Sequence, residues 1–393
     1  NITYKKGDWF TMNGTEGFVY DKKLDLVKSN FINNKYFLKL MNLTNKYKKL
    51  IIRTNADNPK DAKLSKKLGA QGIGLCRTEH MFFEKKRIRS VQKMILSNSS
   101  VDRKGAIMEL LPYQKRDFYQ ILKEMAPNPV TIRLLDPPLH EFLPSLKNEK
   151  LIKNLAKNMQ ISSKNIKNRI IDLFEINPML GHRGCRLAIS YPEITEMQVE
   201  AILSACAKLI NKGIKPNPEI MIPLVGTIGE FENQRKIIFS IADKLNEKYN
   251  IKIKYKVGTM IELPRACLVA DEIAKKADFF SFGTNDLTQT TFGFSRDDIG
   301  SFIQDYFDNN IIVEDPFKTI DINGVGQLVK LATEKGREAK PKIKIGICGE
   351  HGGDPKSIYF FDDIKLDYVS CSPYRVPIAR LSAAKNSIRN NSA

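Results

Sequence analysis

Apolar residues along this chain gather in short runs, and the stretches between the runs carry apolar residues at every third or fourth position. Short runs rich in β-branched residues are typical of buried strands, and the wider spacing is typical of amphipathic helices. Eight such runs follow one another: KLIIRTNAD (49–57), GIGLCRTE (72–79), VTIRLLD (130–136), IDLFEINPML (171–180), EIMIPLVG (219–226), KYKVGTMIE (254–262), DFFSFGTND (278–286) and KIKIGICGE (342–350). Strands that alternate with helices indicate a parallel sheet, and eight of them predict an α/β fold, the (β/α)8 TIM barrel.

Two parts of the predicted barrel depart from a simple alternation of strand and helix. The fourth run is the least strand-like of the eight, because Asn177 and Pro178 interrupt it. The connecting stretches 84–129 and 137–170 are too long for simple loops. We therefore predict helical excursions in these two stretches, extending over the top of the barrel.

The residues before the barrel have a different pattern. Residues 1–20 read as a strand, a turn and a second strand, and we interpret them as the end of a preceding domain, so that the chain is expected to be part of a longer protein. Residues 21–47 are expected to form a linker helix, and residues 48–393 to form the barrel. The apolar residues at helical spacing in the linker are Leu24, Phe31, Phe37, Leu38 and Met41.

Polar residues follow most of the predicted strands. In a TIM barrel the catalytic groups come from the C-terminal ends of the strands, which meet at one rim. The residues at or just beyond these ends are Arg77, Glu79, Arg133, Asp136, Arg183, Arg186, Glu262, Asn285, Asp286, Cys348 and Glu350. Several apolar strands are thus predicted to bring their polar residues to a common site.

The acidic and basic residues of this rim suit different tasks. Glu262 and Asp286 lie on successive strands, and two carboxylates with substrate oxygens and water form a typical Mg²⁺ site. Arg77, Arg133 and Arg183 follow three other runs, and converging guanidinium groups bind phosphate through planar forks of donors. The combination indicates an anionic, metal-bridged substrate and phosphoryl transfer as the chemistry.

Cys348 stands among glycines in GICGEHGGD, where it could act as a nucleophile or as a proton donor. No histidine with an acidic partner stands at a diagnostic spacing, which favours the proton donor. His182 and His351 are expected to support the site residues or to be structural, rather than to be catalytic. Arg53 is expected to form an ion pair inside the barrel or to support the site. The remaining cysteines are expected in the core, namely Cys76, Cys185, Cys206, Cys267 and Cys371.

The composition bears on partners and location. The net charge of +19 raises the question of nucleic-acid binding, but the lysines are scattered among Asn and Ile residues and no nucleic-acid-binding motif is found, so we expect no nucleic-acid partner. No apolar run approaches the roughly 18 residues of a membrane span, and we expect no membrane partner. Six widely spaced cysteines without a C-x-x-C pair argue against zinc and disulfides and favour a cytoplasmic location.

Several motifs together are similar to a known family. GIGLCRTEHMFF, TIRLLDPPLHEF, EINPMLGHRGCRL, GTMIELPRACLVADEIA, FFSFGTNDLTQTTFGFSRDD and GICGEHGGDP resemble the C-terminal part of the pyruvate, phosphate dikinase branch of the phosphoenolpyruvate (PEP)-utilising enzymes. The similarity is nearly continuous from about Lys49 to Ala384. It implies a TIM barrel that binds PEP and pyruvate.

The resemblance also implies roles for individual residues. Mg²⁺ would be held by Glu262 and Asp286, and Cys348 would protonate C3 of the enolate on the way to pyruvate. Arg77 and Arg133 would bind the phosphoryl and enolate oxygens. The remaining substrate contacts implied by the family are Gly283, Thr284 and Asn285, with Arg183 and Arg296 as further phosphate contacts.

In this family the phosphoryl group moves between PEP and a histidine in a T-S-H motif on a swivelling domain, and a further (ATP-grasp) domain binds the nucleotide. Residues 1–20 resemble only the last strands of the swivelling domain. The chain has four histidines, His80, His140, His182 and His351, and none stands in that motif. The resemblance therefore implies a phosphohistidine domain as a partner in cis or in trans, and a homodimer formed through the barrel.

Three other functions remain open. The barrel could be a non-catalytic remnant that only binds PEP or forms a dimer, although the full set of strand-end residues argues against this. It could belong to a PEP synthase-like relative. It could also belong to a metal-dependent lyase that acts on a pyruvate enolate, although Cys348 and the three arginines fit phosphoryl transfer better than this lyase chemistry.

Overall fold

A computed structural model describes residues 3–14, 16–26, 33–84, 86–97 and 99–392. The chain divides into two compact units, Asn1–Asn42 and Leu43–Ala393. In the first unit, β1 (Thr11–Asn13) pairs with β2 (Phe18–Tyr20) in antiparallel register, which confirms the predicted strand, turn and strand. Helix α1 (Lys35–Tyr47) begins later than expected, so Leu24 lies outside it, and Phe31 lies outside the described residues.

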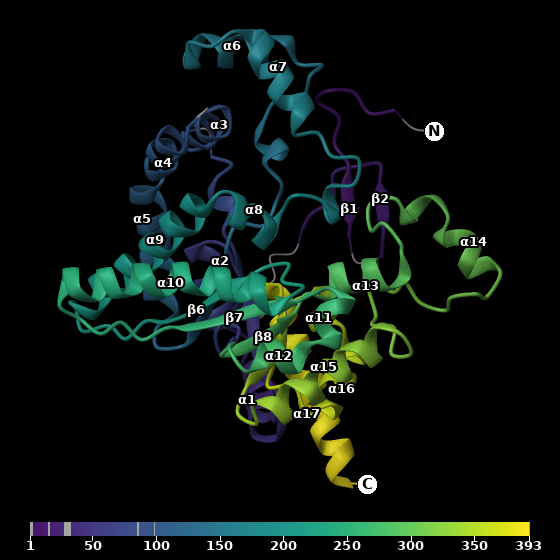
Figure 1. The fold of residues 1–393 in the computed structure, drawn as a ribbon. Helices are drawn as coiled ribbons and strands as arrows, with labels where there is room; N and C mark the ends of the chain where they lie inside the picture. Colours follow the sequence, from purple (N-terminus) through teal and green to yellow (C-terminus); the bar gives the residue numbers. More distant parts are fainter. Residues whose placement is uncertain (1–2, 15, 27–32, 85, 98, 393) are drawn as a thin grey trace. The chain divides into compact units, whose positions relative to one another are not determined.

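The second unit contains a closed barrel of eight parallel strands, as predicted. The order around the barrel is β10, β3, β4, β5, β6, β7, β8 and β9. Strands β6, β7 and β8 lie side by side near the centre of Figure 1. The strands are β3 (Ile51–Asn55), β4 (Ile73–Arg77), β5 (Pro129–Arg133), β6 (Asn217–Ile222), β7 (Lys256–Ile261), β8 (Phe279–Phe282), β9 (Lys344–Ile347) and β10 (Tyr368–Cys371).

One predicted strand is wrong. Residues 171–180 contain the end of α7 (Ser163–Asp172) and a short 3-10 helix, η4 (Pro178–Leu180). Their apolar side chains are largely exposed, at 70% for Phe174 and 97% for Ile176, so the apolar pattern there does not reflect burial. The eighth strand is β10, which pairs with both β9 and β3 and closes the barrel. Only four residues long and buried throughout, it lacks the alternation that marks longer strands.

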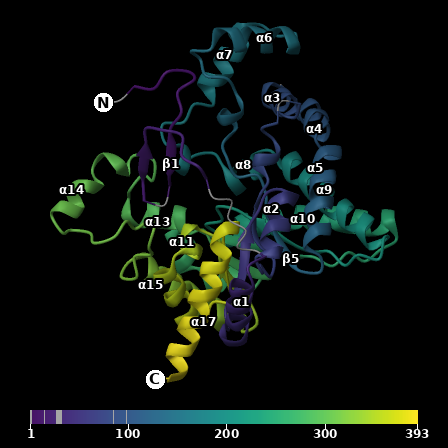
Figure 2. The ribbon, with the colours of Figure 1, turned by 180° about the vertical axis from the view of Figure 1, so that it is seen from behind.

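Helices cover the outside of the barrel between successive strands. Figure 2 shows α2, α5 and α9 side by side on this surface. Helix α10 begins with a capping box, in which Thr227 Oγ1 accepts the N–H of Glu230 and the Glu230 carboxylate accepts the N–H of Thr227. These helices are α2 (Pro59–Lys67), α5 (Leu111–Met125), α9 (Pro192–Ile210), α10 (Ile228–Tyr249), α11 (Pro264–Leu268), α12 (Ala270–Ala274), α15 (Val325–Ala339), α16 (Pro355–Asp363) and α17 (Val376–Ser392).

The two long connections are helical, as predicted. The first holds α3 (Ile88–Leu96) and α4 (Ser100–Met108), and the second holds α6 (Glu149–Met159) and α7. Figure 1 shows α6 and α7 beyond α3 and α4, away from the strands. Both connections contribute buried apolar residues to clusters outside the barrel. Separately, no helix in the described ranges is long and apolar enough to span a membrane.

Arg53 lies inside the barrel and forms the ion pair that was one of its two expected roles. Its side chain is fully buried, Nη1 donates to Glu219 Oε2 at 2.6 Å, and the guanidinium carbon lies 4.0 Å from the ring centre of Tyr368. Thr131 Oγ1 donates to the same carboxylate oxygen at 2.7 Å. Strands β3, β5, β6 and β10 are therefore joined by one buried polar network.

Candidate active site

Glu262 is the first residue after β7, and its side chain is completely buried. The N–H of Leu224 donates to Oε1 at 2.6 Å, whereas Oε2 has no hydrogen-bond partner among the described residues. Leu224 has a φ of 60°, a left-handed conformation that is strained for a non-glycine residue and that often marks functional sites. Burial, followed by the charges of Asp286 and Asp136, raises the pKa of Glu262 to about 8.

Gly283 gives the Glu262 side chain its space. A Cβ atom at Gly283 would lie 2.7 Å from Glu262 Oε2 and 2.8 Å from Met260 Sδ, both closer than van der Waals contact. Because residue 283 follows β8 directly, β8 ends in glycine where the neighbouring carboxylate turns toward it. Gly283, which is predicted to line the substrate, is thus also the residue whose missing Cβ leaves room for the Glu262 carboxylate.

Asp286 lies in the first turn of α13 (Thr284–Phe292), which follows β8. Arg183 Nη1 donates to its Oδ1 at 3.1 Å. Burial is the largest cause of its raised pKa. Glu262 and Asp286 therefore follow neighbouring strands, and the charge of Asp286 contributes to the raised pKa of Glu262.

Arg133 and Arg183 are held by a shared carboxylate. Arg133 Nη1 lies 2.8 Å from Asp136 Oδ2, and Arg183 Nη2 donates to the same oxygen at 2.5 Å. Arg133 Nη2 also donates to Glu79 Oε1 at 2.5 Å, and all four side chains are buried. Asp136 and Glu79 were predicted at the rim without a role, and the structure shows that they fix both guanidinium groups.

Arg183 reaches this cluster from a different element than expected. It immediately precedes α8 (Gly184–Ser190), within the long connection after β5, and does not follow a strand. Gly184, with a φ of 57°, allows the sharp turn at this point, and its N–H donates to the carbonyl of Asp136 at 2.9 Å. The connection thereby folds back onto the rim.

Arg77 and Arg296 lie in a more open part of the site. Arg77 ends β4, and its Nη1 is 3.9 Å from Asp57 Oδ2. Arg296 Nη2 is 3.7 Å from Glu350 Oε1, with a side chain that is 47% exposed. Both arginines line a cavity of about 350 Å³ together with Glu350. They are therefore weakly paired and reachable by a ligand.

Cys348 follows β9 directly and is only 2% exposed. Its thiol packs with apolar side chains, including Met260 and Phe279, and lies 3.7 Å from the carbonyl of Phe282. Burial raises its pKa to about 11. The group is thus a thiol at neutral pH, which supports a proton donor better than a nucleophile.

Thr284 and Asn285 contact the loop after β9. His351 Nε2 donates to the carbonyl of Pro316 at 2.8 Å, so Nδ1 is left to accept from Thr284 Oγ1 at 2.7 Å. Asn285 Oδ1 accepts the N–H of Glu350 at 3.4 Å. His351 is fully buried, and both of its ring nitrogens have hydrogen-bond partners.

The other predictions for single residues can also be placed. His182 Nε2 lies 2.9 Å from Ser190 Oγ, outside the contacts of the rim described above. The five cysteines expected in the core are buried and free. Arg186 donates to the carbonyls of Leu180 and Gly181, so its guanidinium supports the turn before α8.

The acidic pair fits Mg²⁺ by its donor chemistry. The unpartnered, buried Oε2 of Glu262 is an oxygen that needs a cation or a proton. Within the described ranges no group of three or more His, Cys, Asp or Glu side chains is placed to hold a metal ion. Magnesium commonly takes one or two carboxylates and completes its shell with water and substrate oxygens, so the pair is sufficient.

Comparison with known proteins identifies the family of this chain. Residues 33–388 match the model of the PEP-binding domain of the PEP-utilising enzymes. The chain belongs to the PEP-utilising enzyme family. This membership confirms the family that the sequence motifs indicated.

The chain is similar over most of its length to known proteins of this family. It is 54% identical over 382 residues to the chloroplastic pyruvate, phosphate dikinase of Flaveria trinervia, which covers 97% of the chain and 40% of the relative. It is 48% identical over 389 residues to the pyruvate, phosphate dikinase of Clostridium symbiosum, which covers 99% of the chain and 44% of the relative. The chain thus spans about two fifths of the length of these relatives.

Proposed function

We propose that this chain performs the PEP/pyruvate half-reaction of a pyruvate, phosphate dikinase. It would bind PEP and pyruvate at the barrel rim and move a phosphoryl group between PEP and a histidine on a swivelling domain. The observation that carries the proposal is the buried Glu262 carboxylate, with one oxygen unpartnered, beside Asp286 and two arginines fixed in place. Two acids and several arginines suit a phosphorylated carboxylic acid better than a neutral substrate.

Glu262 and Asp286 would hold Mg²⁺, which when bound would neutralise negative charge on the substrate oxygens. Arg183 donates to Asp286 and therefore sets the position of the second acid. The backbone N–H of Leu224 does the same for Glu262. Both ligands are thus oriented before substrate arrives, which lowers the cost of binding.

Arg77 and Arg133 would bind the phosphoryl and enolate oxygens, with Arg183 as a further phosphate contact. Arg133 and Arg183 are the two of these that are held in buried ion pairs. Their positions are set by Asp136 and Glu79 through buried ion pairs, so the guanidinium groups need little reorganisation when charge develops on the substrate. Arg77 and Arg296 would add contacts from the open side of the site. Gly283, Thr284 and Asn285 would line the substrate, with Thr284 oriented by its bond with His351.

Cys348 would supply the proton that turns the enolate into pyruvate. The S–H bond breaks, a C–H bond forms at C3, and the thiol is left as a thiolate. The pKa of about 11 keeps the proton on sulfur at neutral pH, so Cys348 still carries the proton that it donates when the enolate forms.

The proposal includes a phosphohistidine domain in cis or in trans, because no histidine of this chain stands in the T-S-H motif. Relatives more than twice as long as the matched region leave room for such a domain and for an ATP-grasp domain. A homodimer and a cytoplasmic location are part of the same proposal. The six free cysteines favour a reducing compartment.

Calorimetric titration with oxalate, a planar mimic of the pyruvate enolate, tests this function. We expect oxalate to bind the purified chain at near-physiological salt only when Mg²⁺ is present. Glu262→Ala should abolish the Mg²⁺-dependent heat, because it removes one of the two carboxylates. Equal heats with and without Mg²⁺, or no binding by the wild-type chain, would contradict the proposal and favour a non-catalytic remnant.

Gly283→Ala is expected to weaken Mg²⁺-dependent oxalate binding by about 10- to 100-fold, because the new Cβ displaces the Glu262 carboxylate. The backbone at residue 283, with a φ of −92°, accepts alanine, but the new Cβ also overlaps the buried Met260 Sδ at 2.8 Å, so we expect the melting temperature to fall as well. Gly105→Ala in α4, where a Cβ meets no atom within 4 Å, is the matched control. An unchanged affinity in Gly283→Ala would show that the carboxylate does not need this space.

A further inference from the structure

Asp57 lies two residues beyond the end of β3 and contacts the last residue of β4. The hydrogen bonds between these two strands continue to Ala56, whose N–H donates to the carbonyl of Leu75 at 3.1 Å. One step further along, a side chain takes the place of the backbone, because Asp57 Oδ1 accepts the N–H of Arg77 at 2.6 Å. A carboxylate thereby fixes the backbone of Arg77, one of the arginines of the rim.

The second oxygen of this carboxylate has two neighbours. His80 Nδ1 lies 2.7 Å from Asp57 Oδ2, whereas Arg77 Nη1 lies 3.9 Å from the same oxygen. An ionised carboxylate only accepts hydrogen bonds, so Nδ1 of His80 carries the hydrogen in this contact. The histidine thus makes the hydrogen bond, and the arginine is left at a distance too long for one.

His80 reaches Asp57 because the chain turns directly after β4. It lies in the short 3-10 helix η2 (Glu79–Met81), which begins two residues beyond Arg77. Glu79 and Met81, on either side of it, are buried, whereas the His80 side chain is 56% exposed. The orientation of the imidazole is therefore set by its contact with Asp57 and not by burial in the core.

Arg77 has few other contacts that hold its side chain. In the described ranges Asp57 is the only carboxylate that forms an ion pair with Arg77, and the side chain is 29% exposed at the cavity of about 350 Å³. Positive charges around this cavity repel the guanidinium, so a carboxylate of Asp57 without its histidine would draw Arg77 closer. The other cations that line the cavity are Arg296, Lys318 and Arg375.

We propose that His80 is a positioning residue that acts on Arg77 through Asp57. The imidazole occupies Oδ2 of the carboxylate and keeps it from closing onto the guanidinium, so the donors of Arg77 stay free for the substrate. The inference rests on the proposed function and deepens it, because it names the residues that keep a substrate arginine available. Neither His80 nor Asp57 has another role in the proposed half-reaction.

Calorimetric titration with PEP in the presence of Mg²⁺ measures the effect on substrate binding. We expect His80→Phe to weaken PEP binding by about three- to fivefold, which corresponds to the ion pair that Arg77 would form with Asp57 instead. His80→Asn should bind PEP like the wild type, because its amide Nδ2 takes the place of the imidazole Nδ1 and donates to the same oxygen. Equal losses in His80→Phe and His80→Asn would indicate a structural role of the ring and overturn the proposal.

A double variant tests the route through Asp57. In an Asp57→Asn chain the neutral amide no longer attracts the guanidinium, so adding His80→Phe should leave PEP binding unchanged. Lys335→Met removes a partly exposed ion pair with Asp271 elsewhere on the barrel and is the control for the loss of a side-chain contact, without effect on PEP binding. A full three- to fivefold effect of His80→Phe in the Asp57→Asn chain would show that the histidine does not act through this carboxylate.

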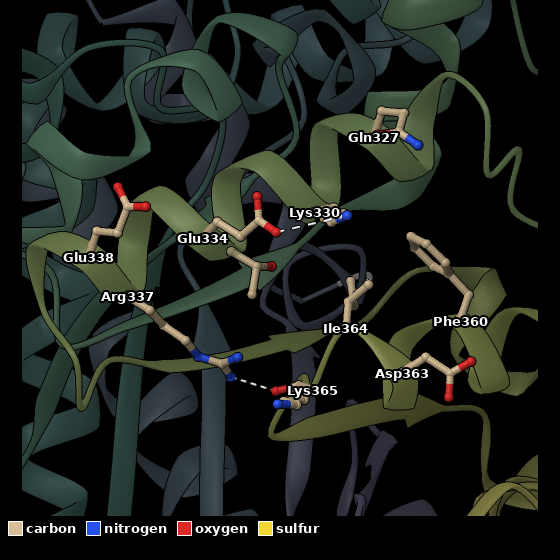
Figure 3. Close-up of a pocket in the computed structure, with 10 residues that line it drawn as sticks. Gln327, Lys330, Glu334, Arg337, Glu338, Phe360, Asp363, Ile364 and Lys365 are labelled. Carbon is tan, nitrogen blue, oxygen red and sulfur yellow. Dashed lines mark hydrogen bonds and ion pairs between the residues drawn. The ribbon is translucent and has the colours of Figure 1, made fainter. Parts of the chain in front are cut away.

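Modification by phenylglyoxal, followed by mass spectrometry, tests the same geometry without substrate, because the reagent attacks guanidinium groups that are not held in ion pairs. Arg77 should react about three- to fivefold more slowly in His80→Phe than in the wild type or in His80→Asn. Arg337 is the internal control, since it is 28% exposed and lies 3.6 Å from Asp367, values close to those of Arg77. It lines the cavity of about 720 Å³ between α15 and α16 that Figure 3 shows, and its rate should be the same in all variants.

The two measurements separate the positioning role from the proposed function. PEP binding by the wild type, with equal reactivity of Arg77 in the wild type and in His80→Phe, would refute the positioning role and leave the function intact. No PEP binding by the wild type, with slower modification of Arg77 in His80→Phe, would contradict the function and retain the effect of His80 on Arg77. A parallel change at Arg337 would reflect an alteration of the whole chain and would also refute the positioning role.

Discussion

Replacing Cys348 by alanine is expected to slow the exchange of the methyl hydrogens of pyruvate by about 10²- to 10⁴-fold, the range over which a positioned acid or base acts. Exchange requires a base that removes a proton from C3 and an acid that returns one. Cys348 lies at the end of β9, buried and protonated at neutral pH, and would perform both steps through its thiolate and thiol forms.

Proton NMR of pyruvate in D₂O, with Mg²⁺ and the purified chain, measures this exchange. Because only the thiolate can remove the proton and the pKa is about 11, the wild-type rate should rise between pH 7 and pH 9. Oxalate binding should persist in Cys348→Ala, which separates a lost proton donor from a lost site. Cys206→Ala, at a buried thiol of α9, is the matched control. Exchange at the wild-type rate in Cys348→Ala would assign the proton to another group.

Removing Arg53 is expected to destabilise the chain by about 3 to 5 kcal/mol, because Arg53→Met takes the closest counter-charge from the buried Glu219 carboxylate and leaves only Lys344 Nζ, 3.8 Å from Oε1. Burial by itself would raise the pKa of Glu219, and the adjacent guanidinium lowers it below its usual value. A carboxyl group with a lowered folded-state pKa contributes stability above its unfolded value, about 4.3, and loses it as the pH falls through the folded value.

Chemical denaturation monitored by circular dichroism at neutral pH measures the loss. The double variant Arg53→Met, Glu219→Leu should be more stable than Arg53→Met, because it leaves no unpaired buried charge in this pair. Lys330→Ala, at an exposed ion pair of α15, should change the free energy of unfolding by less than about 1 kcal/mol. A similarly small change for Arg53→Met would show that the barrel interior tolerates the isolated carboxylate.

Local signals explain which parts of the fold were predictable. Seven of the eight predicted runs are strands of the barrel, because each is a short run of apolar, mostly β-branched or aromatic residues of the length that strands share. The remaining prediction, the fourth run at residues 171–180, failed because apolar side chains there, such as Phe174, are exposed. Strand β10 was missed although β8, which is equally short and equally buried, was found, so length and burial do not separate the two cases. The pattern shows which residues are apolar, but only tertiary packing decides whether those residues are buried.

For the candidate site, position after a strand was the informative signal. Glu262, Asp286, Arg133 and Cys348 were placed at the rim by this rule, and the structure brings the first three into one charged cluster. The rule could not show that Asp136 joins Arg133 to Arg183, since it says nothing about pairing across long connections. Arg375 and Lys318 were not considered at all, because Arg375 lies in the short 3-10 helix η7 (Pro373–Arg375) after the missed strand β10 and Lys318 lies in a turn away from any strand end.

The sequence by itself determined the barrel class, the family and the residue types at the rim, because strand and helix periods and short motifs are local properties of the chain. Only the tertiary structure decided how these residues act together. It closed the barrel with β10 and gave Glu262 an unpartnered oxygen against Gly283. It also placed four cations from separate segments of the chain, namely Arg77, Arg296, Lys318 and Arg375, around one cavity. Such features depend on distances between residues far apart in the chain, which burial and close packing set and local patterns do not encode.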